Sequence, residues 1–213
     1  GGLMSDGPAE IVHDRDYPFF KGNEAFLTSS EVAFVSMGGN FLEKASDYKG
    51  SLEVVKNYLS SDYLFENVRL KGGAYGAWIY FNPFSGFLSM TSYRDPNVGK
   101  TVEAYKKIPQ NLEKFRMSEE SFTSIKIGAY AAFDPLLSPF AKGKKAREDM
   151  LTGIDQEYVE KTVCGILNTK QKDIIEYAGL FREFLERSII TAIGNADKIK
   201  KDGAIFDKLT EII

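Results

Sequence analysis

An arginine and a tyrosine stand six residues apart in a glycine-rich stretch of the chain. Arg69 is followed by Gly72 and Gly73, and these are followed by Tyr75. Both side chains are hydrogen-bond donors at neutral pH. Residues six apart in a straight strand point the same way but lie about 20 Å apart, and glycines, which tolerate positive φ, favour a bend between them. The pair could therefore serve one surface. The alternative is that the tyrosine belongs to the core and the arginine is solvated.

Two apolar runs around a turn follow this stretch. The runs cover residues 76–81 and 87–93 and are rich in aromatic and apolar side chains. Residues 82–86 between them read Asn-Pro-Phe-Ser-Gly, a composition typical of turns. Pro83 has no backbone N–H to donate to a strand ladder, which supports the turn. The pattern predicts a β-hairpin over residues 69–93, with at least the first strand apolar on both faces.

Strand-like and helix-like patterns elsewhere in the chain would position this hairpin. Strands are predicted at residues 24–37 and 188–193. Residues 46–64 and 170–187 have apolar side chains at helical spacing, and Ser51 is a possible cap for the first of these helices. Further helices are predicted at residues 97–115 with a break at Pro109, 118–133, 138–151, 155–167 and 197–213. This order predicts an α+β fold of two layers, a largely antiparallel sheet covered on one face by helices.

Composition limits the classes of function. The chain has 213 residues, of which 43% are hydrophobic, and its formal net charge is −3. A sizeable core is therefore available, and the acidic balance argues against nucleic acid as a partner. No apolar run reaches membrane-spanning length, so no membrane partner is expected. The basic residues at positions 142–147 indicate a solvated helix face rather than a nucleic-acid patch.

The chain contains one histidine, His13, and one cysteine, Cys164. A helical His-x-x-Glu-His zinc site needs two imidazoles, so we expect no metal site in this chain and a solvated role for His13. Cys164 falls within a helical pattern and is predicted to be a small buried residue. A reducing compartment fits a lone cysteine without being required by it.

Two glycine motifs resemble nucleotide-binding loops but lack their context. Gly72-Gly73-x-x-Gly76 opens a predicted strand, whereas a dinucleotide-binding loop opens a helix. Gly99-Lys100-Thr101 does open a predicted helix, but Arg94 occupies the place of the first P-loop glycine. Neither motif therefore predicts a nucleotide site.

The order and spacing of several short motifs resemble the C-terminal half of zinc metallopeptidases of the insulinase/pitrilysin family, and most of all the presequence-protease branch. The resemblance runs from about Asn23 to Asp197, nearly the whole chain. The motifs are Arg69-x-x-Gly72-Gly73-x-Tyr75-Gly76, Ser92-Tyr93-Arg94-Asp95-Pro96, Asn23-Glu24-Ala25-Phe26, Gly38-Gly39-Asn40, and Leu137-Ser138-Pro139 with Lys142-Gly143.

The resemblance implies a division of the chain and of the chemistry. Residues 1–22 would be a connecting arm, and residues 23–213 a single C-terminal domain without the zinc site. The zinc of the parent enzyme would be bound by an N-terminal catalytic half of the same polypeptide, through an inverted His-x-x-Glu-His motif that this chain lacks. No cofactor is expected in this chain. The two halves would enclose an unfolded peptide, in the cytoplasm or in an organelle matrix.

The resemblance also implies roles for individual residues. Tyr75 would be catalytic and substrate-binding, donating its phenol proton to the oxyanion of the tetrahedral intermediate. Arg69 would bind carbonyl or carboxylate oxygens of the substrate. Gly72 and Gly73 would keep the chamber wall free of side chains. Two alternatives stay open: a domain of an inactive family member that serves as a binding or assembly subunit, and an independent α+β binding module.

Overall fold

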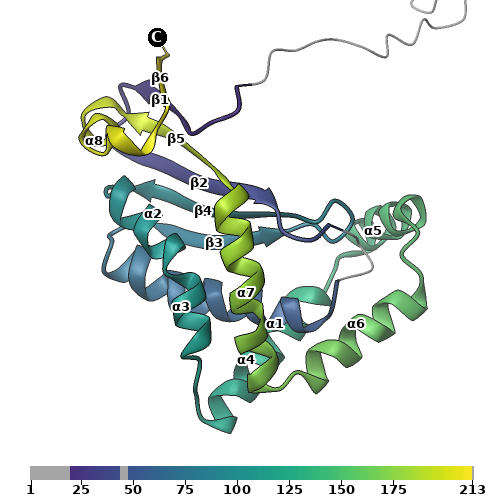
Figure 1. The fold of residues 1–213 in the computed structure, drawn as a ribbon. Coiled ribbons are helices and arrows are strands. Elements are labelled where there is room, and N and C mark those ends of the chain that lie inside the picture. Colours follow the sequence, from purple (N-terminus) through teal and green to yellow (C-terminus); the bar gives the residue numbers. More distant parts are fainter. Residues whose placement is uncertain (1–19, 44–47, 213) are drawn as a thin grey trace, which may run out of the picture.

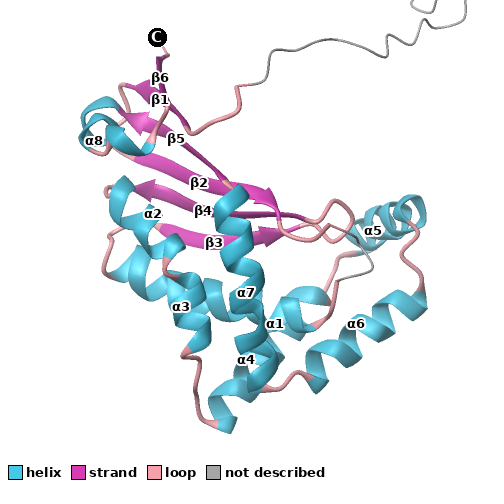
Figure 2. Ribbon diagram, in the orientation of Figure 1, coloured by secondary structure: helices cyan, strands magenta, loops and turns pink. Residues whose placement is uncertain are grey.

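The fold has two layers, a six-stranded sheet and a set of helices packed on one of its faces (Figures 1 and 2). The computed structural model describes residues 20–43 and 48–212. The strand order is β3-β4-β2-β5-β1-β6. The strands are β1 (Glu24–Thr28), β2 (Ala33–Asn40), β3 (Gly76–Phe81), β4 (Phe87–Asp95), β5 (Ile189–Asn195) and β6 (Lys208–Glu211). Pairing is antiparallel from β3 to β5 and parallel for β5 with β1 and β1 with β6. The predicted largely antiparallel α+β class is thus confirmed.

The helices follow the predicted order, and most of their boundaries are close to those expected. They are α1 (Ser51–Tyr58), the π-helix η2 (Leu59–Leu70), α2 (Val98–Lys106), α3 (Ile108–Glu113), α4 (Glu119–Phe133), α5 (Pro139–Thr152), α6 (Gln156–Asn168), α7 (Gln171–Arg187), α8 (Ala196–Lys201) and the 3-10 turn η3 (Gly203–Ile205). The break predicted at Pro109 occurs two residues earlier, at Lys107, and Pro109 lies in the first turn of α3. The side chains of Ser118, Ser138 and Asp155 accept hydrogen bonds from the first turns of α4, α5 and α6.

One face of the sheet forms the core. Alternate residues of the central strands, such as Val35 and Met37 of β2 and Met90 of β4, are almost completely buried under the helices. Phe181 and Phe184 of α7 lie in the same core, and Phe184 is fully buried. Their rings contact that of Phe41 just after β2. The period-two alternation therefore places the apolar set of each strand against the helical layer.

The opposite face of the sheet is not covered within the described residues. Trp78 and Tyr80 of β3 are 44% and 55% exposed, whereas Ile79 and Phe81 between and after them are buried. The first hairpin strand, predicted to be apolar on both faces, is therefore buried on one face and exposed on the other. The strand is apolar on both faces in composition, but the helices pack on one face only.

Four other predictions are corrected. The strand predicted at residues 24–37 is two strands, β1 and β2, which do not pair with each other. Ser51 is the first residue of α1, after Gly50, and does not cap it with its side chain; residues 46 and 47 of that predicted helix lie outside the described residues. The predicted C-terminal helix ends at Lys201, and strand β6 follows it. Cys164 is exposed on α6.

Strand β6 forms because its neighbour stabilises it. The backbone of β6 pairs with β1, and Lys208 forms a 2.6 Å ion pair with Glu24 of that strand. The hydroxyl of Thr210 donates to Glu24 at 3.0 Å. The charged sequence of this edge strand discourages pairing with a further strand. The predicted arm, residues 1–22, lies largely outside the described residues, and the boundary at residue 23 stays a prediction. None of the described helices is long and apolar enough to cross a membrane.

We expect Phe184→Ala to lower the free energy of unfolding by about 3–5 kcal/mol, because it opens a cavity in the core that α7 forms with the sheet. Phe140 of α5, which is 85% exposed, provides a matched control. Phe140→Ala should change stability by less than about 0.5 kcal/mol. Urea unfolding measures both, and equal effects of the two substitutions would contradict the assignment of the core.

Candidate functional site

Arg69 and Tyr75 line the same open cavity, whose volume is about 700 Å³. The residues that line the cavity belong to the end of the sheet where β4 ends and β3 begins, and Figure 1 shows these strand ends. The end of helix η2 and the segment that leads into β3 supply one wall, through Arg69, Leu70, Gly73, Ala74 and Tyr75. Residues 30–32, between β1 and β2, supply a second wall, and Arg94 of β4 supplies a third. The two residues singled out from the sequence are therefore brought together.

Arg69 reaches the cavity from a helix and not from a strand. It lies in the last turn of η2, so the prediction of an extended chain from residue 69 is wrong. The N–H of Gly73 donates to the Arg69 carbonyl at 2.9 Å, and the N–H of Ala74 donates to the Val68 carbonyl at 3.1 Å. These bonds end the helix and reverse the chain, which brings Tyr75 back toward Arg69.

Glycine is required at positions 72 and 73 for different structural reasons. Gly73 has a φ of 81°, a region that glycine adopts without strain, and it lines the cavity. A Cβ on Gly72 would stand 2.4 Å from the carbonyl oxygen of Val68. Gly72 is therefore needed for the tight helix end, where there is no room for a side chain. The role in the chamber wall that the resemblance implied for both glycines stays a prediction.

Hydrogen bonds fix the segment with Arg69 and Tyr75 to the end of β4. The N–H of Tyr75 donates to the Tyr93 carbonyl at 3.0 Å. The side-chain amide of Asn97 donates to the Gly72 carbonyl at 2.6 Å. Asn97 is in turn held by Asp95, a fully buried carboxylate that accepts from the Asn97 N–H at 2.8 Å and from the Thr101 hydroxyl at 2.6 Å. The site is therefore built across two segments that hold each other in place.

The aromatic residues of the open sheet face support Tyr75. Its ring packs edge-on against Tyr93, with centroids 5.8 Å apart. Tyr93 also contacts Phe34 of β2 at 5.2 Å and Trp78 of β3 at 6.5 Å. Tyr75 nevertheless remains 68% exposed. Its ring is thus supported on one side while the rest of the side chain is accessible from the cavity.

The cavity contains three charged side chains, Arg69, Arg94 and Glu31. Within residues 20–43 and 48–212, neither arginine forms an ion pair. The Arg69 guanidinium lies over the ring of Phe65, 5.0 Å from the centroid. The sequence predicts no role for Arg94 in this site, although Arg94 belongs to the Ser92–Pro96 motif. Its position at the cavity depends on its backbone conformation, which no pattern in the sequence indicates.

The described residues do not fit a zinc site. They contain no group of three or more His, Cys, Asp or Glu side chains placed to hold a metal ion. His13 lies outside the part of the chain that the structure describes. We therefore derive no chemical step through a metal from this chain.

The start of α2, which has the Gly99-Lys100-Thr101 sequence, already binds an anionic group of the protein itself. The N–H of Gly99 donates to the carboxylate of Asp202 at 2.8 Å. A Cβ on Gly99 would stand 2.6 Å from the same carboxylate. A helix N-terminus attracts phosphate through its free N–H groups, and here Asp202 takes that place. This contact supports the prediction that the motif does not bind nucleotide.

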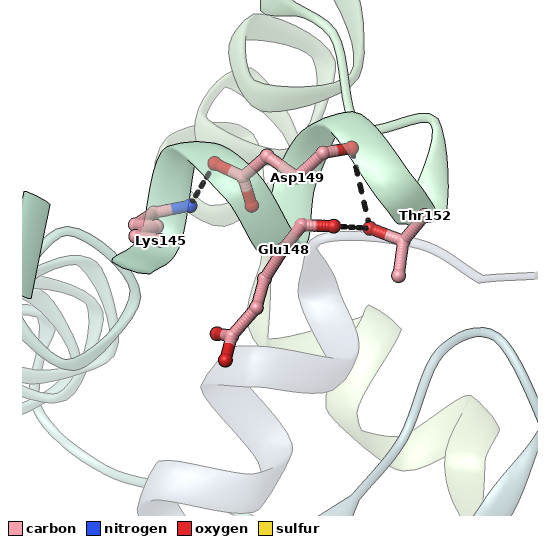
Figure 3. Close-up of polar contacts among 4 residues, drawn as sticks. All are labelled: Lys145, Glu148, Asp149 and Thr152. Atoms are coloured by element: carbon pink, nitrogen blue, oxygen red, sulfur yellow. Dashed lines mark hydrogen bonds and ion pairs between the residues drawn. The ribbon is translucent and has the colours of Figure 1, made fainter. Parts of the chain in front are cut away.

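The basic stretch at residues 142–147 lies on α5, which has no buried residue. Two of its lysines have acidic partners one turn away: Lys145 pairs with Asp149 at 2.7 Å (Figure 3), and Lys144 pairs with Glu148 at 3.7 Å. The Thr152 hydroxyl donates to the carbonyls of Glu148 and Asp149 in the last turn. The helix therefore has the mixed charge of a solvated surface.

Comparison with known proteins places the chain among peptidase domains. The sequence profile of the family described as the PreP C-terminal domain matches residues 23–193. Protein HypA of Clostridium perfringens is 34% identical over 200 residues, which cover 94% of this chain and 20% of that protein. Presequence protease 1, chloroplastic/mitochondrial, of Arabidopsis thaliana is 30% identical over 197 residues, 92% of this chain and 18% of that protein. The chain thus spans about a fifth of the length of these relatives.

Solved structures share the fold. A peptidase M16 inactive domain from Pseudomonas fluorescens superposes with a TM-score of 0.60 at 13% identity, covering 83% of this chain and 44% of that one. Pitrilysin superposes with a TM-score of 0.55 at 12% identity, covering 83% of this chain and 20% of that one. At these identities the likeness concerns the fold alone.

We expect Asn97→Ala to lower the free energy of unfolding by about 1 kcal/mol, because it removes the hydrogen bond to the Gly72 carbonyl. Amide hydrogen exchange at residues 72–75 should become faster, since the link to β4 is lost. Gln156→Ala on α6 is a matched control, because its amide bonds only the exposed Glu160 of the same helix. Unchanged exchange at residues 72–75 in Asn97→Ala would contradict the role of this link.

Proposed function

Because the chain belongs to the family of presequence-protease C-terminal domains, we propose that it is the C-terminal substrate-chamber domain of a zinc-dependent metalloendopeptidase that degrades unfolded peptides. The observation that carries the proposal is that Arg69 and Tyr75, which lie six residues apart in sequence, line one open cavity. An open site suits an extended peptide better than a small ligand, which usually occupies an enclosed pocket.

Tyr75 is the proposed catalytic residue. It stabilises the oxyanion that forms when the scissile carbonyl of the peptide is attacked, by donating the proton of its phenol Oη. Its exposure at the cavity and the support of its ring by Tyr93 favour this role. Donors that are fixed before the reaction stabilise developing charge most effectively, because they need no reorganisation.

Arg69 is the proposed substrate-binding residue. Its guanidinium carries parallel N–H donors that match the carbonyl or carboxylate oxygens of a peptide. The absence of an ion-pair partner among the described residues leaves these donors available to substrate. Tyr75 would share in this binding, since both side chains border the same space.

The zinc would be bound by another part of the polypeptide. An N-terminal catalytic half would bind the metal and face this domain across the substrate, and the described residues fit no such site themselves. The relatives are about five times the length that matches this chain, which leaves room for such a half. Two relatives' names refer to mitochondria or chloroplasts, and we propose the cytoplasm or an organelle matrix for this protein.

A second candidate is a domain of an inactive peptidase that serves in binding or assembly. The same fold occurs in a domain described as a peptidase M16 inactive domain, so the fold is compatible with this role. The presence of both Arg69 and Tyr75 at one cavity argues against it, because a scaffold needs neither donor. An inverted His-x-x-Glu-His motif upstream in the same polypeptide would support the active enzyme, and its absence there would support the scaffold.

In the full-length polypeptide we expect Tyr75→Phe to lower kcat by about 10²–10³, the usual effect of losing one oxyanion donor. Tyr80→Phe is a matched control, because Tyr80 is also an exposed tyrosine but lies on β3 outside the cavity. It should retain the wild-type rate. Steady-state hydrolysis of an unfolded peptide measures both variants, and a wild-type kcat for Tyr75→Phe would remove Tyr75 from the mechanism.

We expect Arg69→Ala to raise KM by about tenfold, the loss of roughly one charge-assisted hydrogen bond. Arg116→Ala, in the connection between α3 and α4, should leave KM unchanged because that side chain is exposed away from the cavity. Circular dichroism verifies that both variants are folded. Equal KM values for wild type and Arg69→Ala would exclude Arg69 from substrate binding.

A further inference from the structure

Strand β4 contains a bulge beside the cavity. Ser92 pairs with Val35 of β2, but the next pair along the ladder joins Asp95 with Ala33. Between these two pairs β4 has two residues, Tyr93 and Arg94, whereas β2 has one, Phe34. Strand β4 therefore contains one extra residue at this point. Arg94 has a φ of 51°, the one positive value among non-glycine residues of the described chain.

The bulge changes the direction in which the strand presents its side chains. Regular alternation would bury Arg94 and expose Asp95, since Ser92 is buried and Tyr93 is exposed. The observed order is reversed after Tyr93: Arg94 is exposed at the cavity and Asp95 is buried. Bulges next to functional sites commonly aim a side chain in this way. Here the bulge places the guanidinium of Arg94 at the cavity and the carboxylate of Asp95 in the core.

Glycine would be the sterically easiest residue at this position. The left-handed region is open to glycine without strain, whereas the Cβ of an arginine crowds the backbone there. A strained residue that lines a site is a reason to look for a function of its side chain. The backbone conformation after Arg94 is stabilised by Asp95, because the Asp95 carboxylate accepts hydrogen bonds from the Asn97 N–H and the Thr101 hydroxyl.

We propose that Arg94 acts with Arg69 to bind a carboxylate of the peptide substrate, either an acidic side chain or the C-terminal carboxylate. This inference rests on the proposed function of the cavity as a peptide site. Two guanidinium groups border the same space, and among the described residues neither has an ion-pair partner. Guanidinium groups bind carboxylates through parallel charge-assisted hydrogen bonds.

Glu31 adds a negative charge to the site, which opposes the two positive charges of the arginines. Its exposed carboxylate lines the same cavity and repels an anionic ligand. Its backbone position is fixed, because Lys198 donates to the Glu31 carbonyl at 2.7 Å and Asn195 donates to the Ser30 carbonyl at 2.9 Å. The preference for a carboxylate therefore depends on two attractive charges and one repulsive charge, and it should change in opposite directions when each kind is removed.

The test uses the full-length polypeptide and labelled peptides, with binding measured by fluorescence anisotropy. In the first kind of pair, one peptide has Glu and the other has Gln at the same position, and this position is varied along the peptide. In the second kind, one peptide has a free C-terminus and the other an amidated C-terminus. For at least one pair we expect the anionic peptide to bind on the order of tenfold more tightly. The pair that shows the preference identifies the source of the carboxylate.

Three variants test the assignment. Arg94→Gly and Arg94→Gln should both lose the preference, and Arg94→Gly should melt at the wild-type temperature or above because glycine accepts this backbone conformation. Glu31→Gln should increase the preference by a few-fold. Arg116→Gly is the matched control and should leave it unchanged.

The outcomes separate this inference from the proposed function. Loss of the preference in both Arg94 variants, with the neutral peptides bound as before, supports the assignment. An unchanged preference in folded Arg94→Gly or Arg94→Gln, or no preference in wild type for either pair, overturns it. Because binding is measured after a chelator has removed the metal of the full-length polypeptide, so that no peptide is hydrolysed, failure of Tyr75→Phe to lower kcat would overturn the proposed catalysis and leave the carboxylate result standing.

Discussion

Two hydrogen bonds join the end of helix η2 to the end of strand β4, and the candidate site depends on them. One runs from the Tyr75 N–H to the Tyr93 carbonyl and the other from the Asn97 amide to the Gly72 carbonyl. The cavity residues come from three separate segments, residues 30–32, residues 69–75 and Arg94, so the site exists only where these segments meet. The buried carboxylate of Asp95 stabilises the same junction from beneath, by fixing Asn97.

One face of the sheet forms the hydrophobic core, and the other lies next to the candidate site. The covered face, with Val35, Met90 and the aromatic side chains of α7, forms a single core with the helices. On the open face Phe34 and Trp78 contact Tyr93, and Tyr93 contacts Tyr75 next to the cavity. A rigid scaffold on one side and accessible donors on the other would suit the proposed role as a chamber wall, because donors fixed in advance lose little entropy when a substrate binds.

Local signals in the sequence predicted much of the secondary structure. Ser118, Ser138 and Asp155 cap the helices that they were expected to begin, since capping depends only on neighbouring residues. Predictions failed where a distant partner decides. Strand β6 forms because β1 offers its edge, and Cys164 is exposed because nothing packs on its side of α6 among the described residues. Arg69 is helical because η2 continues α1 up to the glycines.

The sequence by itself determined the chemistry that the site can offer, because the donors of Arg69 and Tyr75 and the family motif around them are properties of residue type and order. It also determined the alternation that builds the covered face. Only the tertiary structure decided that these two residues share a cavity, that Arg94 joins them and that Asp95 is buried. The first outcome depends on the chain reversal at the end of η2, where Gly73 and Ala74 donate to the Arg69 and Val68 carbonyls. The physical reason for the other two is the bulge in β4: a one-residue change of register reverses which side chains face the helices, and pairing with β2 sets that register.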